Sequence, residues 1–65
     1  MNYMKPEQIA EALQVNIKRV RKRIREMKPL VGKDYPWDSM LMDDGITRVD
    51  LSTYVEFCNR RNHDR

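Results

Sequence analysis

Residues 16–28 read NIKRVRKRIREMK, and this stretch decides the fold of the chain. Its apolar side chains recur at the spacing i, i+3, i+7 and i+10, which is typical of a helix with one buried side. These side chains are Ile17, Val20, Ile24 and Met27. Asn16 is a good N-cap for the helix, and Pro29 ends it because the residue before a proline resists the α conformation. The sequence therefore predicts a helix over residues 17–27.

The outward side of this helix is strongly basic. Residues 16–28 hold seven Lys or Arg and a single acid, whereas residues 31–58 hold two Lys or Arg and six acids. The net charge of +3 therefore hides a positive charge concentrated on one element, which indicates a polyanionic partner. The residues expected to contact this partner are Asn16, Lys18, Arg19, Arg21, Lys22, Arg23 and Arg25.

A second, shorter helix is predicted over Pro6–Leu13, just before the basic one. Pro6 suits the first helical position and Glu7 suits the positive end of the helix dipole. The two helices, separated by a short break, make a helix-turn-helix in which the first helix braces the second. In such a motif the second helix enters the major groove of duplex DNA and leads with its N-terminal turns.

This placement assigns roles to the basic residues. We expect Lys18, Arg19 and Lys22 to lie nearest the bases, where arginine reads guanine through two hydrogen bonds. The other arginines, Arg21, Arg23 and Arg25, are expected to grip the phosphate backbone. Asn16 is expected to contact an adenine or a phosphate.

A loop and a hairpin are predicted after the basic helix. Residues 30–39 contain Gly32 and Pro36 and are expected to form a loop, with Tyr35 and Trp37 folded back over the core. Asp43-Asp44-Gly45 stands between two short apolar runs, and Asp-Gly in that setting is a hairpin signal.

A last helix is predicted over residues 51–61, capped by Asp50 or Ser52. Its expected buried face consists of Leu51, Tyr54, Val55 and Cys58, with Phe57 at its edge. Residues 62–65 are expected to fray.

The predicted fold class is mainly α with a small β-hairpin, in one domain spanning residues 1–65. The order helix, turn, helix, loop, hairpin, helix is that of a winged helix-turn-helix. So short a chain buries only about 60% of the surface that its unfolded form exposes, so an enzyme cleft is not expected. The sequence has no Gly-rich phosphate loop and no nucleophile–base–acid set, and no cofactor is expected.

Cysteine use and hydropathy set the expected compartment. The lone Cys58 excludes an internal disulfide, which suits a reducing cytoplasm. Cys58, His63 and Asp64 are too few ligands for a structural zinc site, so no metal is expected. No apolar run approaches the roughly 20 residues that span a membrane, and the N-terminus lacks the apolar core of a signal peptide. We expect a protein of the bacterial cytoplasm or of a phage-infected cell, without a membrane partner.

Two parts of the sequence resemble a known family. Residues 4–16 (MKPEQIAEALQVN), continuing to Val20 and Ile24, resemble the opening of excisionase-type and MerR-like helix-turn-helix domains. Ile46–Asp50 (ITRVD), followed by a helix, resembles the second wing strand and final helix of those domains. The resemblance implies a winged-helix DNA-binding protein of a phage or mobile element that acts as an excision factor or a transcriptional regulator.

The chain departs from the family pattern at two places. Gln14 stands where the family usually has glycine between its first two helices, so the turn must be strained or of another geometry. Asp43 and Asp44 occupy the tip of the wing, where carboxylates repel phosphate. The wing is therefore either structural or approaches DNA only through Thr47 and Arg48.

Double-stranded DNA is the partner that these observations favour. Further copies of the chain (a dimer or an array on repeated sites) and an integrase or another phage or host protein are additional candidates. Two other functions remain open. The acidic wing, with Met40 and Met42, is also consistent with a module that docks a host or phage protein. An Arg-rich helix also enters distorted RNA grooves.

Overall fold

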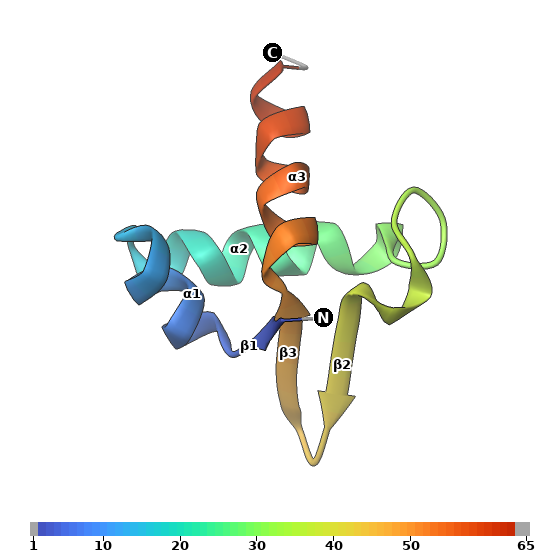
Figure 1. The fold of residues 1–65 in the computed structure, drawn as a ribbon, viewed down its shortest axis with the longest axis horizontal. Helices are drawn as coiled ribbons and strands as arrows, with labels where there is room; N and C mark the ends of the chain where they lie inside the picture. The colour runs from blue at the N-terminus through green and yellow to red at the C-terminus, as the bar shows by residue number, and fades with distance from the viewer. Residues whose placement is uncertain (1, 64–65) are drawn as a thin grey trace.

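The computed structural model describes residues 2–63, which form three helices and a small three-stranded antiparallel sheet (Figure 1). The elements are β1 (Tyr3–Met4), α1 (Pro6–Leu13), α2 (Ile17–Met27), β2 (Met40–Asp43), β3 (Ile46–Asp50) and α3 (Leu51–His63). Two short 3-10 turns, Lys28–Leu30 and Trp37–Ser39, flank the loop between α2 and β2. Figure 1 shows α3 crossing α2, and the β2–β3 hairpin extending away from the C-terminal end of α3. The chain is thus a small α/β domain.

The bounds predicted for α1 and α2 are confirmed. The Asn16 side chain caps α2, because its Oδ1 accepts a hydrogen bond from the Lys18 backbone N–H at 2.8 Å. Between the helices, Gln14 takes the left-handed conformation (φ 55°, ψ 48°). The Val15 N–H donates to the Ala10 carbonyl at 3.0 Å, the pattern that commonly ends a helix before such a residue. Gln14 therefore takes the left-handed backbone conformation that glycine usually supplies in such a turn, although it carries a Cβ.

Strand β1 was not predicted from the sequence. It pairs antiparallel with β3, with Tyr3 opposite Asp50 and Met4 opposite Val49, so β3 is the central strand. Two residues are too few to show an alternating pattern. The strand is defined only by its pairing with β3, which lies far along the chain. Asp50 joins the two ends of the fold, since its Oδ1 accepts from the Asn2 N–H at 3.3 Å and its Oδ2 accepts from the Thr53 hydroxyl at 2.8 Å.

Asp50 is also the cap of α3, one of the two predicted caps, because its Oδ2 accepts from the Thr53 backbone N–H at 3.3 Å. The predicted hairpin is confirmed too. Strands β2 and β3 pair from Met40 opposite Val49 to Asp43 opposite Ile46. Asp44 and Gly45 both have positive φ, 51° and 76°, which matches the right-handed twist of a two-residue hairpin.

The core lies where α1, α2, β3 and α3 meet. Its buried apolar side chains are Ile9, Ala10, Val20, Ile24, Met27, Tyr35, Val49, Tyr54 and Phe57. The face predicted for α3 was wrong at two positions, because Val55 is exposed and Phe57 is buried. The helical spacing from Tyr54 leads to Phe57 and Cys58, and Val55 lies off that stripe.

The prediction for the loop aromatics was half right. Tyr35 is buried and meets Phe57 edge to face, with ring centroids 6.0 Å apart. Trp37 was expected over the core, but its side chain is 80% exposed. Tyr35 and Phe57 already fill this part of the core, and the 3-10 turn that begins at Trp37 buries Ser39 instead.

The end of α3 also differs from expectation. The helix continues through residues 62–63, which were expected to fray, while residues 64–65 lie outside the described part. Over residues 2–63, no helix has both the length and the apolar character needed to cross a membrane.

The left-handed conformation of Gln14 leads to a stability prediction. A side chain in this region costs roughly 1–2 kcal/mol, whereas glycine adopts it freely at a cost in entropy. Gln14→Gly should therefore raise the free energy of unfolding by up to about 1 kcal/mol, measured by urea titration with circular dichroism. The control is Ala12→Gly on the exposed side of α1, which should lower it by about 1 kcal/mol. If Gln14→Gly lowers the free energy of unfolding as much as Ala12→Gly does, the strain assigned to Gln14 is contradicted.

Candidate nucleic-acid interface

The outward face of α2 carries exposed cations. Val20, Ile24 and Met27 are buried, which fixes the rotation of the helix about its axis. At 3.6 residues per turn, Lys18, Lys22 and Arg25 then lie within about 60° of one another on the far side. All three are exposed, as are Arg21 beside them and Lys28 after the helix. We call Lys18, Arg21, Lys22 and Arg25 the basic face.

One residue of the basic face is linked to the bracing helix. The Arg21 guanidinium lies 3.4 Å from the Glu7 carboxylate at the start of α1, and both side chains are well exposed. A surface ion pair of this kind contributes only about 0–1 kcal/mol, so Arg21 can exchange Glu7 for a phosphate at little cost.

The single acid of α2 lies at the edge of the basic face, where it lines a hollow together with Lys22, and it is paired with α3. Glu26 Oε2 lies 2.6 Å from Nη1 of Arg61 on α3. Its charge is therefore paired on the side of α2 that faces α3. Because Arg61 neutralises Glu26, this carboxylate offsets little of the positive charge of the basic face.

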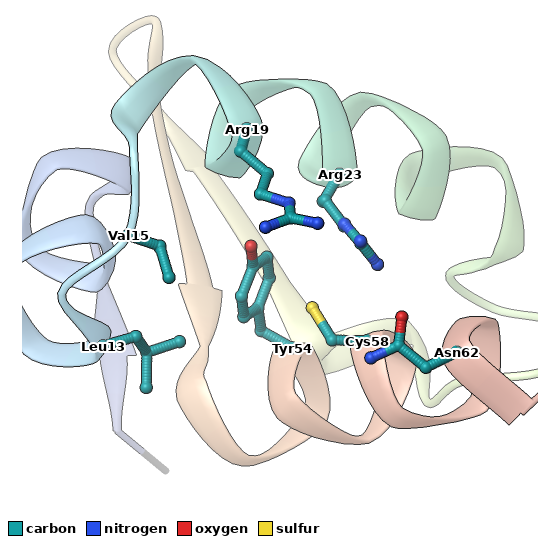
Figure 2. Close-up of a pocket in the computed structure, with 7 residues that line it drawn as sticks. All are labelled: Leu13, Val15, Arg19, Arg23, Tyr54, Cys58 and Asn62. Carbon is teal, nitrogen blue, oxygen red and sulfur yellow. The ribbon is translucent and has the colours of Figure 1, made fainter.

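Arg23 lies elsewhere than expected. It is only 8% exposed, and it extends from α2 toward Cys58 and Asn62 on α3 (Figure 2). The position of Arg23, three residues after Val20 and four before Met27, puts it on the buried side of the helix, and this spacing was readable in the sequence. Burial is incompatible with the phosphate contact expected of this side chain.

Arg19 and Asn16 are placed at the margins of the basic face. Arg19 is exposed, but Figure 2 shows its side chain directed toward the Tyr54 hydroxyl, not outward with Lys18 and Lys22. Asn16 is exposed at the start of α2, with its carbonyl oxygen engaged in the cap. Its amide nitrogen remains for an outside acceptor.

The hairpin presents fewer candidate contacts. Arg48 is half-buried on β3 opposite Leu41, and it lies on the other face of the strand from buried Val49. Asp43 and Asp44 are exposed at the turn. Thr47 lines a shallow hollow together with Glu7. Because Glu7 also meets Arg21, the start of α1 touches both the hairpin turn and the basic face.

Sequence reasoning missed a cavity of about 200 Å³ between the α1–α2 turn and α3. Figure 2 shows its lining, which comes from three separate segments: Leu13, Val15, Arg19, Arg23, Tyr54, Cys58 and Asn62. No local pattern marks such a set, because only the folded chain brings them together. Among residues 2–63, no group of three His, Cys, Asp or Glu side chains is placed to hold a metal ion.

Tyr54 is the one lining residue with a strongly shifted pKa. Burial, and then its hydrogen bond to Cys58 and the electrostatic effect of that residue, raise the pKa of Tyr54 to about 12, against the opposing effect of Arg23 and Arg19. The phenol therefore stays protonated beyond its ordinary titration range, with its hydrogen engaged by Cys58.

Comparisons with protein-family models, with curated proteins and with solved structures return no match to this chain.

The raised pKa of Tyr54 predicts a specific alkaline titration. In the unfolded chain this phenol ionises near its ordinary pKa of 10.0, and in the folded protein near 12. Between these pH values the unfolded state releases a proton that the folded state keeps, so the free energy of unfolding falls as the pH rises. An ultraviolet absorbance titration of phenolate should show that Tyr54→Phe removes the step near pH 12. Loss of a step near pH 10 would contradict the burial of this hydroxyl.

Proposed function

We propose that the chain is a sequence-specific double-stranded DNA-binding protein in which α2 enters the major groove. One observation carries the proposal: the apolar stripe of α2 is buried, and the four cations of the basic face opposite it are exposed. Lysine and arginine contacts to phosphate supply most of the affinity of such proteins. The positive charge of α2 and the outward direction of its basic face thus both suit contact with a DNA duplex.

In this proposal α1 and α2 act as a helix-turn-helix and β2–β3 as its wing. α1 packs against α2, and it contributes Glu7, which meets Arg21 near the basic face. Lys18 and Lys22, on the first two turns of α2, are placed to approach base edges. Arg21 and Arg25 grip phosphates on either side, while Arg19 and Asn16 contribute at the margin. Arg23 is left out because it is buried.

The wing plays a minor part. Asp43 and Asp44 would meet phosphate with like charge, which disfavours a deep approach of the hairpin tip. Arg48, on the exposed face of β3, is the hairpin residue best suited to a single backbone contact. The biological role that fits a small groove-binding domain of this kind is that of a phage or mobile-element regulator or excision factor. A 65-residue domain gains affinity by binding as several copies or beside an integrase.

The test compares two pairs of charge-removing substitutions. Arg21→Gln with Arg25→Gln, the two residues assigned to phosphates, should lower affinity for a mixed-sequence duplex at least tenfold, measured by fluorescence anisotropy at low salt. The slope of log affinity against log salt concentration should also become less steep by about 2. The reason is that each lost phosphate contact releases roughly one fewer counterion. The control, Lys33→Gln with Arg60→Gln, removes two exposed cations outside α2 and should change affinity less than threefold.

Equal losses from both pairs would overturn the assignment to α2. Structured RNA is added as a competitor in the same assay. If RNA displaces the duplex at lower concentration than unlabelled duplex does, the partner is RNA.

A protein-docking module is the second candidate, and the exposed tryptophan favours it. Trp37 is 80% exposed, and Met42 and Leu41 on β2 are 57% and 43% exposed. Tryptophan is enriched where proteins bind proteins. Release from heparin at low salt, together with no change in duplex anisotropy, would favour this function over DNA binding.

A further inference from the structure

The cavity between the α1–α2 turn and α3 shares only Arg19, at its margin, with the proposed DNA contact. Its lining lies on the side of α2 that faces α3 (Figure 2). The basic face lies opposite the buried stripe of the same helix. Its volume of about 200 Å³ lies below the roughly 300–1,000 Å³ of sites that hold drug-sized molecules. The cavity is thus suited to a ligand of fewer atoms.

The lining has an apolar end and a cationic end. Leu13 and Val15 stand at one end, and each remains more than a third exposed although it is apolar. Arg19 and Arg23 extend over the cavity from α2. The remaining lining residues are Tyr54, Cys58 and Asn62, so the set contains no carboxylate to balance the two guanidinium groups.

A buried donor in this lining lacks a partner. Nη1 of Arg23 is inaccessible to solvent and has no hydrogen-bond partner among the described residues, although the side chain is 92% buried. Buried charged donors are normally paired, since an unpaired one loses its hydration without compensation. An acceptor that enters the cavity reaches Nη1 once the Arg23 guanidinium turns toward it, and it then supplies the missing hydrogen bond.

The apolar end and the cationic end of the lining together indicate which ligand the cavity suits. Guanidinium groups present planar pairs of N–H donors that match the two oxygens of a carboxylate. Leu13 and Val15 add an apolar wall, which favours a ligand with a hydrocarbon tail over inorganic phosphate.

We propose that this cavity binds a small organic monocarboxylate, with Arg19 and Arg23 holding the carboxylate and Leu13 and Val15 contacting its apolar tail. The proposal goes beyond DNA binding and does not depend on it, because no residue of the basic face lines the cavity.

The first experiment titrates the full chain, without DNA, against three probes followed by amide chemical shifts. Hexanoate carries both the charge and the tail, hexanol only the tail, and acetate only the charge. Hexanoate should bind saturably and at least tenfold more tightly than either of the others, with shifts centred on Val15, Arg19 and Tyr54. Equal binding of the three probes, or no saturable binding of hexanoate, would overturn the proposal.

The second experiment uses matched arginine substitutions. Arg19→Gln should weaken hexanoate binding about tenfold or more, the effect of losing a charge-assisted hydrogen bond. Arg25→Gln, which removes the same group from the basic face, should leave it unchanged. Equal weakening in both variants would identify unspecific ion pairing and overturn the site.

A third variant keeps the test independent of the buried arginine, whose loss endangers folding. Leu13→Gln should weaken hexanoate binding while leaving the weak binding of acetate unchanged. If inorganic phosphate displaces hexanoate completely at equal concentration, the cavity is a simple anion site and the proposed apolar contact is wrong.

Discussion

The fold depends on the burial of one apolar stripe. Val20, Ile24 and Met27 bring α2 against the rest of the core, and two of the three are fully buried. Full burial of an aliphatic side chain contributes roughly 1.5–3 kcal/mol, so this stripe is comparable to the whole net stability of a small domain, about 5–15 kcal/mol. Because the stripe has a single direction on the helix, it also fixes where every charged residue of α2 points.

That rotation divides the arginines and lysines of α2 into two groups. Lys18, Lys22 and Arg25 are carried to the side opposite the core, where they stay hydrated and available to a polyanion. Arg19 and Arg23 are turned toward α3, where they border a cavity with an apolar end. A run of basic residues that looks uniform in the sequence thus belongs to two surfaces, with Arg19 at the boundary between them.

Local signals account for what the sequence predicted correctly. Helices α1 and α2 were predicted to the residue because Pro6, Asn16 and Pro29 mark their ends by rules that act within one turn. Asp44 and Gly45 mark the hairpin in the same way, through the positive φ that its turn requires. Each of these features is decided by neighbours close in the chain.

Features that depend on distant residues could not be predicted. Strand β1 is only two residues long and forms by pairing with β3 near the opposite end of the chain. The burial of Tyr35 depends on its contact with Phe57, which lies on another element. The cavity forms only where the α1–α2 turn, α2 and α3 come together. Arg23 is the exception, since its spacing from Val20 and Met27 already indicated burial.

The central claim is that the basic face of α2 lies against duplex DNA. It is tested most directly by adding a mixed-sequence duplex to the isotope-labelled chain and mapping the side-chain and amide resonances that change. The account predicts the largest changes at Lys18, Arg21, Lys22 and Arg25, and little change in the second half of α3. Changes centred on Trp37 and β2, with the basic face unaffected, would contradict it.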